Sequence, residues 1–288
     1  NPFIERFNVD RKQPFIHLNT IFIASNIILH LFHYLAKPLL TVPKLSDNIL
    51  VGSAFSYMGA NIKDNTEKDK LDSNIYDLIL YGSYAITPQN EVNFTSSFAK
   101  IKNSASRSIS IGQMPQRVAT SHSRGSAISV GANFTHNTNI NKYLNMKFST
   151  GIDYHYIRNG RYKEKSADSL SLHVRRQHIE RLIPYITIGG HYDASDRVSL
   201  EASLGIACNI LSGQSVVNAA LKGINGTDTK TTSFKVEGLL QPSLSAQTGI
   251  AIVYKCSERI SASLGYNGSV WSGDFSENTV YFRASIKI

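Results

Sequence analysis

The sequence predicts an all-β fold and, within that class, an antiparallel transmembrane β-barrel. Three observations predict it: apolar and polar residues alternate over unusually long segments, short turn signals alternate with long polar connections, and the alternation continues to the last residue. A period of two indicates strands with one apolar and one polar face. Strands that cross a bilayer must close into a barrel, because an open sheet edge would leave backbone groups unpaired in lipid.

The composition limits the class of protein. Of 288 residues, 42% are hydrophobic and 18% are charged, which excludes a disordered chain and leaves enough apolar side chains for a large core or a lipid-facing surface. Two cysteines exclude a disulfide scaffold and a cysteine-rich zinc module. Lysine and arginine outnumber aspartate and glutamate by 30 to 21, so the net charge of +9 favours an acidic partner. Charge alone does not choose among nucleic acid, anionic lipid and an acidic polymer.

Residues 1–44 depart from the alternating pattern. The segment Gln13–Ala36 contains no aspartate, glutamate, lysine or arginine and is long enough to cross a bilayer as a helix, but three histidines and two asparagines interrupt it. Pro38 and Pro43 would each remove a hydrogen-bond donor from a strand. A helix and degenerate strands are both possible interpretations of this segment. We expect an atypical N-terminal segment over residues 1–44 and a barrel domain over residues 45–288.

Ten strands are clear in the rest of the sequence. The alternation is sharpest over Leu144–Tyr156, Val198–Ile210 and Ile260–Val270, where apolar side chains face serine, glycine and asparagine on the other side. These segments fit the roughly nine to eleven residues that a tilted strand needs to cross a bilayer. The predicted strands are Asn48–Gly59, Asn74–Thr87, Glu91–Lys102, Ser121–Thr135, Tyr143–Ile157, one within Leu170–Tyr192, Val198–Ile210, part of Phe234–Tyr254, Arg259–Trp271 and Thr279–Ile288.

Connections of two kinds separate the strands. Short turns are rich in proline, asparagine, aspartate and serine, whose rings or side chains favour tight turns. The predicted short turns are Leu45–Ile49, Thr87–Asn90, Asn137–Asn141, Ala194–Val198 and Cys256–Ile260. The predicted long connections are Ile62–Asp72, Asn103–Thr120, Arg158–Ser169, Leu211–Thr232 and Ser272–Asn278. Short turns on one rim and long loops on the other are typical of an outer-membrane barrel, with the long loops outside the cell.

The ordered segments resemble those of the autotransporter C-terminal β-domain, the translocator of type V secretion in Gram-negative bacteria. The resemblance covers about Leu45 to Ile288 and depends on the order and spacing of several segments rather than on a single motif. The matching segments are Leu45–Tyr57, Leu80–Pro88, Gly125–Gly131, Ser233–Gly238 and Trp271–Ser276.

The resemblance implies a twelve-stranded barrel with both ends of the barrel sequence at the periplasmic rim. It further implies a helix in the pore, linked covalently to a passenger that is exported to the cell surface. Strands one and two would then lie within residues 1–44, where a pore helix or linker is the alternative. The expected location is the bacterial outer membrane. The resemblance therefore implies outer-membrane lipid, including lipopolysaccharide, as a partner, the barrel-assembly machinery as a folding partner, and no nucleic acid.

The C-terminal strand resembles the signal that the barrel-assembly machinery reads in this family. Val280, Phe282, Ala284, Ile286 and Ile288 share one face and alternate with polar or tyrosine residues to the end of the chain. The family usually ends in an aromatic residue, whereas Ile288 stands here. A plain final strand is the alternative.

Two further groups of residues are candidates for binding. Aromatic residues near predicted strand ends are candidates for girdles at the membrane interfaces: Tyr154, Tyr156, Tyr254, Tyr266, Trp271, Tyr281 and Phe282. Three arginines form a candidate basic cluster lining the lumen, where they could contact a translocating chain or lipopolysaccharide phosphate: Arg175, Arg176 and Arg181.

No pattern in the sequence supports catalysis. There is no Gly-x-Ser-x-Gly element, the histidines lack spaced partners for a metal, and the Asn-Asn pair at which some autotransporter barrels cleave their passenger is missing. Cys208 and Cys256 are not expected to pair. We therefore expect no enzyme, no catalytic residue, no metal and no cofactor, and we interpret the chain as an outer-membrane translocator. A passenger-less porin or adhesin, an outer-membrane hydrolase barrel and a soluble all-β domain are the alternatives.

Overall fold

The computed structural model describes residues 48–63, 69–110, 115–211, 214–222, 233–240, 243–258, 260–272 and 275–286. Residues 1–47 lie outside the described part of the chain. The Gln13–Ala36 segment, the two strands expected within residues 1–44 and most of the Leu45–Ile49 turn therefore lie outside it too, as does Ile288.

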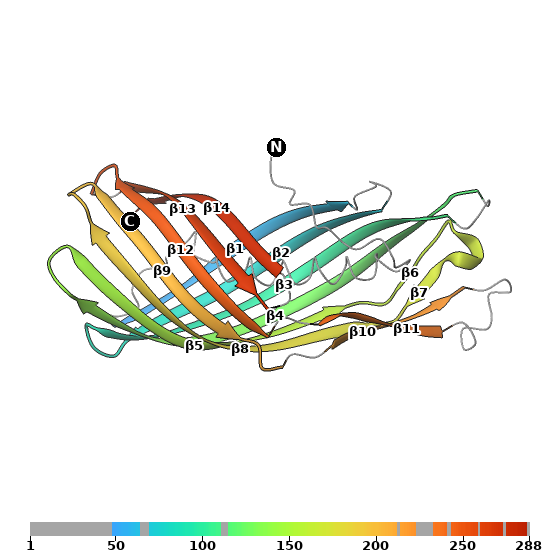
Figure 1. Ribbon diagram of the computed structural model, residues 1–288, viewed down its shortest axis with the longest axis horizontal. Helices are drawn as coiled ribbons and strands as arrows, with labels where there is room; N and C mark the ends of the chain where they lie inside the picture. Colours follow the sequence, from blue (N-terminus) through green and yellow to red (C-terminus); the bar gives the residue numbers. More distant parts are fainter. Residues whose placement is uncertain are drawn as a thin grey trace.

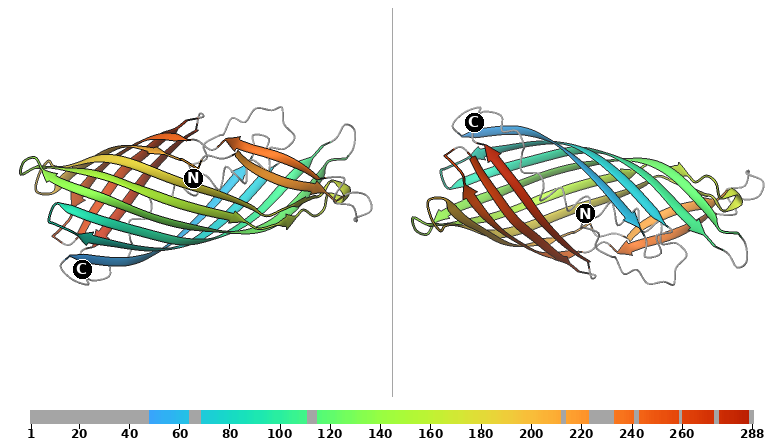
Figure 2. Two further views of the ribbon diagram at one scale, coloured as in Figure 1. Left: turned by 90° about the horizontal axis from the view of Figure 1, so that it is seen from below. Right: turned by 90° about the horizontal axis from the view of Figure 1, so that it is seen from above.

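Ten antiparallel strands form one curled sheet in which every neighbour pair is antiparallel (Figures 1 and 2). The spatial order is β1-β2-β3-β4-β5-β8-β9-β12-β13-β14, so β1 and β14 are its edges. The strands are β1 (Ile49–Lys63), β2 (Lys70–Ala85), β3 (Asn90–Ile109), β4 (Arg117–Asn139), β5 (Leu144–Asn159), β8 (Gln177–Asp193), β9 (Val198–Cys208), β12 (Leu244–Lys255), β13 (Ile260–Trp271) and β14 (Phe275–Ile286).

Each of the ten predicted strands corresponds to one strand of this sheet, and the predicted antiparallel fold is confirmed. Several strands are longer than the alternation indicated. The predicted connection Asn103–Thr120 is wrong over most of its length, because β3 runs to Ile109 and β4 starts at Arg117. These outer ends carry serine and alanine, which weaken the apolar pattern, but they gain a partner strand that pairs them residue by residue.

The short turns owe their shape to side chains that replace backbone hydrogen-bond acceptors. Asn141 Oδ1 accepts hydrogen bonds from the backbone N–H groups of Tyr143 at 2.8 Å and Leu144 at 2.9 Å. Ser257 Oγ accepts one from Ile260 at 3.1 Å, and Ser195 Oγ accepts one from Val198 at the same distance. Asparagine and serine were predicted at these turns for this property. The short turns at 86–89, 140–143, 194–197 and 256–258 all lie at one rim of the sheet (Figure 1).

A second, four-stranded sheet lies at the opposite rim, where the long connections were predicted. Two predicted loops, Arg158–Ser169 and Leu211–Thr232, are therefore corrected in part, because each contributes one strand to this small sheet. The reason is tertiary packing, since short strands with only a few apolar side chains are stable only when another surface buries them. Its elements are β6 (Tyr162–Lys163), the single-turn η1 (Asp168–Leu170), β7 (Leu172–Val174), β10 (Gln214–Leu221) and β11 (Ser233–Leu240), in the order β11-β10-β7-β6.

The small sheet continues the curl of the large one from the outer end of β4. Thr120 and Lys165 exchange two backbone hydrogen bonds, at 3.0 and 2.8 Å, and the Gly160 N–H donates to the Arg124 carbonyl at 2.8 Å. From there the small sheet curls round, so that its apolar side chains meet the inner face of the large sheet (Figure 2). The outer rim is thus built from both sheets.

Candidate functional site: the inner face of the sheet

Burial in the large sheet is the reverse of that in a soluble protein. Large apolar side chains cover the outside, where Leu204 is 68% exposed and Phe282 is 73% exposed. Polar side chains are buried on the inside, where Thr135 and Ser199 are fully buried and Arg181 is 1% exposed. An exposed apolar face opposite a buried polar face is the arrangement that a lipid exterior and a wet interior require.

The half of the inner face near the short turns is polar. Asn93 Nδ2 donates a hydrogen bond to Asn133 Oδ1 at 3.0 Å, and the hydroxyl groups of Thr135 and Ser149 lie 3.0 Å apart. The Lys147 ammonium lies 3.5 Å from a Glu91 carboxylate oxygen. These groups bond to one another across neighbouring strands, so the wall presents amide, hydroxyl and charged groups to the interior.

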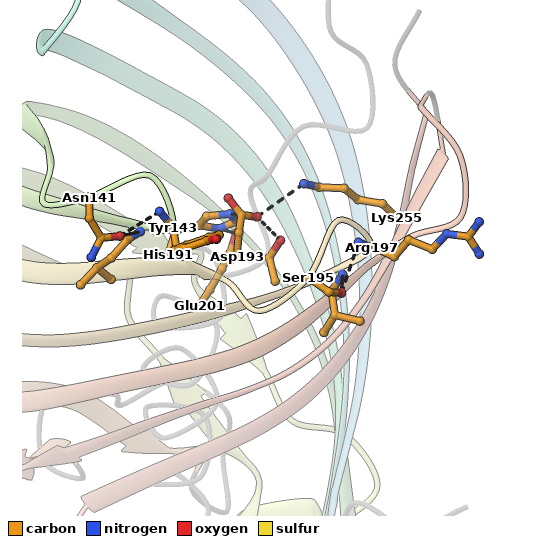
Figure 3. A network of polar contacts seen from close by, with 11 residues as sticks. Asn141, Tyr143, His191, Asp193, Ser195, Arg197, Glu201 and Lys255 are labelled. Carbon is orange, nitrogen blue, oxygen red and sulfur yellow. Dashed lines mark hydrogen bonds and ion pairs between the residues drawn. The ribbon is translucent and has the colours of Figure 1, made fainter.

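The polar wall ends at the short-turn rim in a network of charged side chains (Figure 3). Asp193 Oδ1 accepts a hydrogen bond from Ser199 Oγ at 2.7 Å and lies 3.5 Å from Lys255 Nζ. His191 lies between two carboxylates, with Nε2 3.3 Å from Asp193 Oδ1 and Nδ1 3.6 Å from Glu201 Oε1. The Ser199 hydrogen bond, followed by the charges of Lys255 and His191, holds the pKa of the Asp193 carboxyl below its ordinary value.

The half of the inner face near the outer rim is apolar. Ile75, Ile101, Ile157 and Ile179 of the large sheet are each 4% exposed or less. They form one core with side chains of the small sheet: Leu172, Val174, Val217 and Ala219. Serine or asparagine was predicted along the whole inner face, so the apolar half is a departure from the prediction. On the side of β2 to β8, apolar side chains therefore fill the interior near the outer rim, and we call this packed region the outer core.

A partly buried ion pair fastens the small sheet to the wall. Arg107 of β3 donates to both oxygens of Glu164, through Nε at 3.0 Å and Nη2 at 2.6 Å. Arg107 Nη2 also donates to the Leu170 carbonyl at 3.2 Å, and Glu164 Oε2 accepts the Leu172 N–H at 2.8 Å. Burial, and then the Glu164 charge, raises the pKa of the neighbouring Tyr162 phenol. Because two-point pairs of this kind fix orientation, the segment between β6 and β7 is held in one place.

The three arginines of the predicted basic cluster lie in two environments. Arg175 and Arg176 are exposed between β7 and β8, beside the small sheet. Arg181 lies on the inner face of β8 and is buried, opposite His155 in the strand register. The buried His155 ring is 2.9 Å from Ser129 Oγ. Only Arg181 faces the interior.

The predicted aromatic residues divide between the two faces. Tyr154, Tyr156, Tyr254 and Tyr266 are on the outward face, as a girdle requires. The girdle prediction is corrected for Trp271, whose side chain is 3% exposed and packs on the inner face against Ile183 and Ala207. Its odd number places it in register with the serines of β13, which the alternation had already assigned to the interior.

The girdle prediction is also corrected for Tyr281, which lies on the inner face, but not for Phe282. The Tyr281 ring lies over Gly265 on the inner face, where any side chain at Gly265 would clash with it. Arg283 stacks on that ring at 5.3 Å. Phe282 is outward and exposed, with Val280 and Ala284 on the same face.

Tyrosines at the short-turn rim were missed by the sequence analysis. Tyr84, Tyr143 and Tyr192 are 46 to 50% exposed and lie near strand ends, as Tyr254 does. The signal that could have found them is their position within three residues of a predicted short turn. On β2, Tyr76 and Tyr84 enclose Leu78 and Leu80 over eight residues, about 26 Å along the strand. Tilted by about 40°, this is roughly 20 Å, close to the height of a lipid-facing band.

The described residues contain no group of three or more histidine, cysteine, aspartate or glutamate side chains that could hold a metal ion. Both cysteines are free, with Cys256 exposed in a turn. No helix among the described residues is long and apolar enough to cross a membrane.

An apolar outside, a polar inside, strands of bilayer length and a rim of short turns define an outer-membrane β-barrel. Comparison with protein families makes this specific: the sequence matches the family described as "Autotransporter beta-domain" over residues 40–267. The chain belongs to this family. It is an outer-membrane translocator domain of type V secretion, and its fold is the autotransporter β-barrel fold.

Solved structures agree on the fold. The translocator domain of the autotransporter NalP from Neisseria meningitidis has a TM-score of 0.68 and 13% identity, over 85% of this chain and 77% of that one. The toluene transporter TbuX of Ralstonia pickettii has a TM-score of 0.51 and 8% identity, over 85% and 74%. The monoaromatic hydrocarbon channel CymD also has 0.51, with 7% identity over 83% and 70%. A comparison with curated protein sequences found no match.

Proposed function

We propose that the polar half of the inner face guides a passenger segment, linked covalently ahead of the barrel, through the outer membrane. The observation that carries this proposal is the reversed burial of the large sheet, with polar side chains inside and apolar ones outside. An extended or hairpin segment has backbone groups that need hydrogen-bond partners until it folds, and the amide and hydroxyl groups of Asn93, Asn133, Thr135 and Ser149 can provide them. The proposed work is physical and requires no catalytic residue.

The apolar outer core supports an order of events within this proposal. A segment in transit cannot occupy the space in which Ile101 and Ile157 pack against Val217. The small sheet therefore completes its packing on the wall after the passenger has passed, and it closes that side of the outer mouth. The Arg107–Glu164 pair holds the closed position.

The experiment is a surface-display assay. A short epitope-tagged reporter is fused ahead of Asn1, and the fusion is produced in the outer membrane of a Gram-negative host. We expect protease added to intact cells to remove the tag while the barrel keeps a boiling-dependent change in gel mobility. A reporter with a preformed disulfide-bonded domain is the control, because a folded domain does not fit the interior. A folded barrel whose unfolded reporter stays in the periplasm would contradict export and favour a passenger-less porin or adhesin.

The C-terminal strand is proposed as the assembly signal, through Val280, Phe282, Ala284, Ile286 and Ile288. Of these, Val280, Phe282 and Ala284 lie on the outward face, where an assembly factor can contact them before lipid does. Phe282→Ser is expected to slow assembly by the purified assembly machinery in vesicles, measured as the heat-modifiable fraction over time. Arg283→Ser, on the inner face, is the matched control. Equal assembly rates for both variants would contradict the proposal that the outward face of this strand is the assembly signal.

A further inference from the structure

Four cationic side chains and one histidine gather on the outward face of the large sheet, just beyond its lipid-facing band. We call Lys100, Lys102, Arg124, Arg158 and His178 the outer basic patch. All five are exposed. They come from four neighbouring strands, β3, β4, β5 and β8, on the half of the sheet nearest the long connections (Figure 1).

The patch begins where the apolar side chains of each strand end. On β3 the outward residues change from Phe98 to Lys100, and on β5 they change from Tyr156 to Arg158. On β4 the change from Ile128 to Arg124 has one serine between them. Because the same change occurs on three adjacent strands, the cations follow the outer boundary of the lipid-facing band.

The strand register brings the five side chains together. Lys102 lies directly opposite Arg124, and Arg158 lies directly opposite His178. Ser126 pairs with both Lys100 and Arg158, so Arg124, two residues away on the same face, is diagonal to each. Directly opposite residues have Cβ atoms about 5 Å apart, and diagonal ones about 7–8 Å. Like charges at these separations destabilise a sheet unless something neutralises them.

The residues that the structure describes do not neutralise the patch. Among the residues that the structure describes, Lys100, Arg124 and Arg158 form no ion pair with a carboxylate, and Lys102 lies over the Tyr76 ring at 5.4 Å. Two carboxylates border the patch. Asp72 accepts a hydrogen bond from Asn61, and Glu180 is diagonal to Arg158 without an ion pair. The patch keeps an excess of positive charge.

We propose that the outer basic patch binds the phosphate groups of a phosphorylated glycolipid in the outer leaflet. Its position fits that ligand, because acyl chains packed against the exposed Phe98 and Ile128 would bring the phosphorylated sugars directly above them, beside the patch. Arginine and lysine hold phosphate through charge-assisted hydrogen bonds. Tyr76 and Tyr156 flank the boundary, as aromatic residues at a membrane interface do. This site goes beyond translocation and needs no passenger.

The test compares two double variants of the full chain folded in detergent. K100Q/R158Q removes two charges from the patch, and K142Q/R197Q removes two charges from exposed turns at the opposite rim. Binding of purified bisphosphorylated lipid A is measured by native mass spectrometry. Each lost cation near a membrane surface is worth about fivefold in affinity, so K100Q/R158Q is expected to bind roughly 25-fold more weakly. K142Q/R197Q is expected to stay within about twofold of the unmodified chain.

Two further arms identify the ligand. Dephosphorylated lipid A is expected to bind as weakly as the K100Q/R158Q variant binds the phosphorylated form, whereas inorganic phosphate at equal concentration is expected not to displace lipid A. The proposal is overturned if both double variants lose affinity equally, if dephosphorylated lipid A binds equally well, or if inorganic phosphate displaces the lipid. A boiling-dependent gel shift verifies that each variant is folded. The single variants K100Q and R158Q test the same prediction one charge at a time, and each is expected to lose about fivefold in affinity for lipid A.

Discussion

The two sides of the large sheet differ in the length of their strands. Strands β2 to β5 and β8 have 16 to 23 residues, whereas β9 and β12 to β14 have 11 or 12. A tilted strand crosses a bilayer in about nine to eleven residues. The short side therefore spans the membrane and stops, while the long side continues outward by roughly 15–40 Å measured along the strands. The extra length builds the outer core and carries the outer basic patch.

On the long side, a single strand reverses which of its two faces is apolar between the membrane and the outer rim. On β3, Phe94 and Phe98 face outward in the membrane and Asn93 faces inward. Further along the same strand, Ile101 faces inward and Lys102 faces outward. The first arrangement is stable where lipid lies outside the sheet, and the second where water does, because apolar side chains are favoured on the face that is not in contact with water. The short side stays within lipid and keeps its exposed apolar side chains on the outward face along its whole length.

Removing volume from the outer core is expected to have the largest effect on the long side. Ile157→Ala should cost about 2–5 kcal/mol, because it leaves a cavity between the wall and the small sheet. The small sheet should lose most of this stability, because the outer core holds it against the wall. Trypsin should then cleave at Arg175 and Arg176, while the boiling-dependent gel shift of the barrel remains.

Ile152→Ala is the matched control for that prediction. It removes the same atoms from the same strand, but Ile152 is outward and 44% exposed. Its trypsin cleavage should match that of the unmodified chain. Equal cleavage in both variants would show that the small sheet does not depend on the core, and the distinction between the two halves of the inner face would lose its support.

A charge on the lipid face is expected to have the next largest effect, and it tests the short side. Leu204 is at the middle of β9 and faces outward, so Leu204→Arg should cost about 2–4 kcal/mol in vesicles. Ser203→Arg puts the same side chain on the polar inner face and should cost less. Urea titrations of the vesicle-folded chain measure both. A reversed order would mean that the faces of β9 are assigned wrongly.

Breaking the ion pair of the outer rim is expected to have a smaller effect. Glu164→Gln keeps the shape of the side chain but removes the charge that holds Arg107, at a cost of about 1.5–3 kcal/mol for hydrogen bonds to charged groups. Asp168→Asn is the control, since the Asp168 side chain is 82% exposed and its contact with Arg117 spans 3.5 Å. Hydrogen exchange at residues 162–174 should rise in the first variant only.

The sequence predicted the strands better than the faces. Alternation located all ten strands of the large sheet, and the turn side chains Asn141, Ser195 and Ser257 bond as their residue types indicated. It could not show that the inner face becomes apolar near Ile101, because a period of two does not say which face is wet. The small sheet was missed for a related reason: its strands are too short for a pattern, and packing against the inner face of the large sheet, distant in the sequence, stabilises them.

The smallest expected effect concerns the rim network of the short turns (Figure 3). The pKa of Asp193 is below its ordinary value of 3.8 in the folded chain, chiefly because of the Ser199 hydrogen bond. A depressed carboxyl pKa stabilises the fold above the unfolded value, and that contribution is lost as the pH falls through the folded value. Asp193→Asn should therefore lower the urea midpoint slightly at pH 7, and the difference from the unmodified chain should shrink below about pH 4. Asp196→Asn, in the adjacent turn, should show no such trend. A difference for Asp193→Asn that stayed constant from pH 7 to pH 3 would mean that its charge contributes nothing and that shape alone holds the rim together.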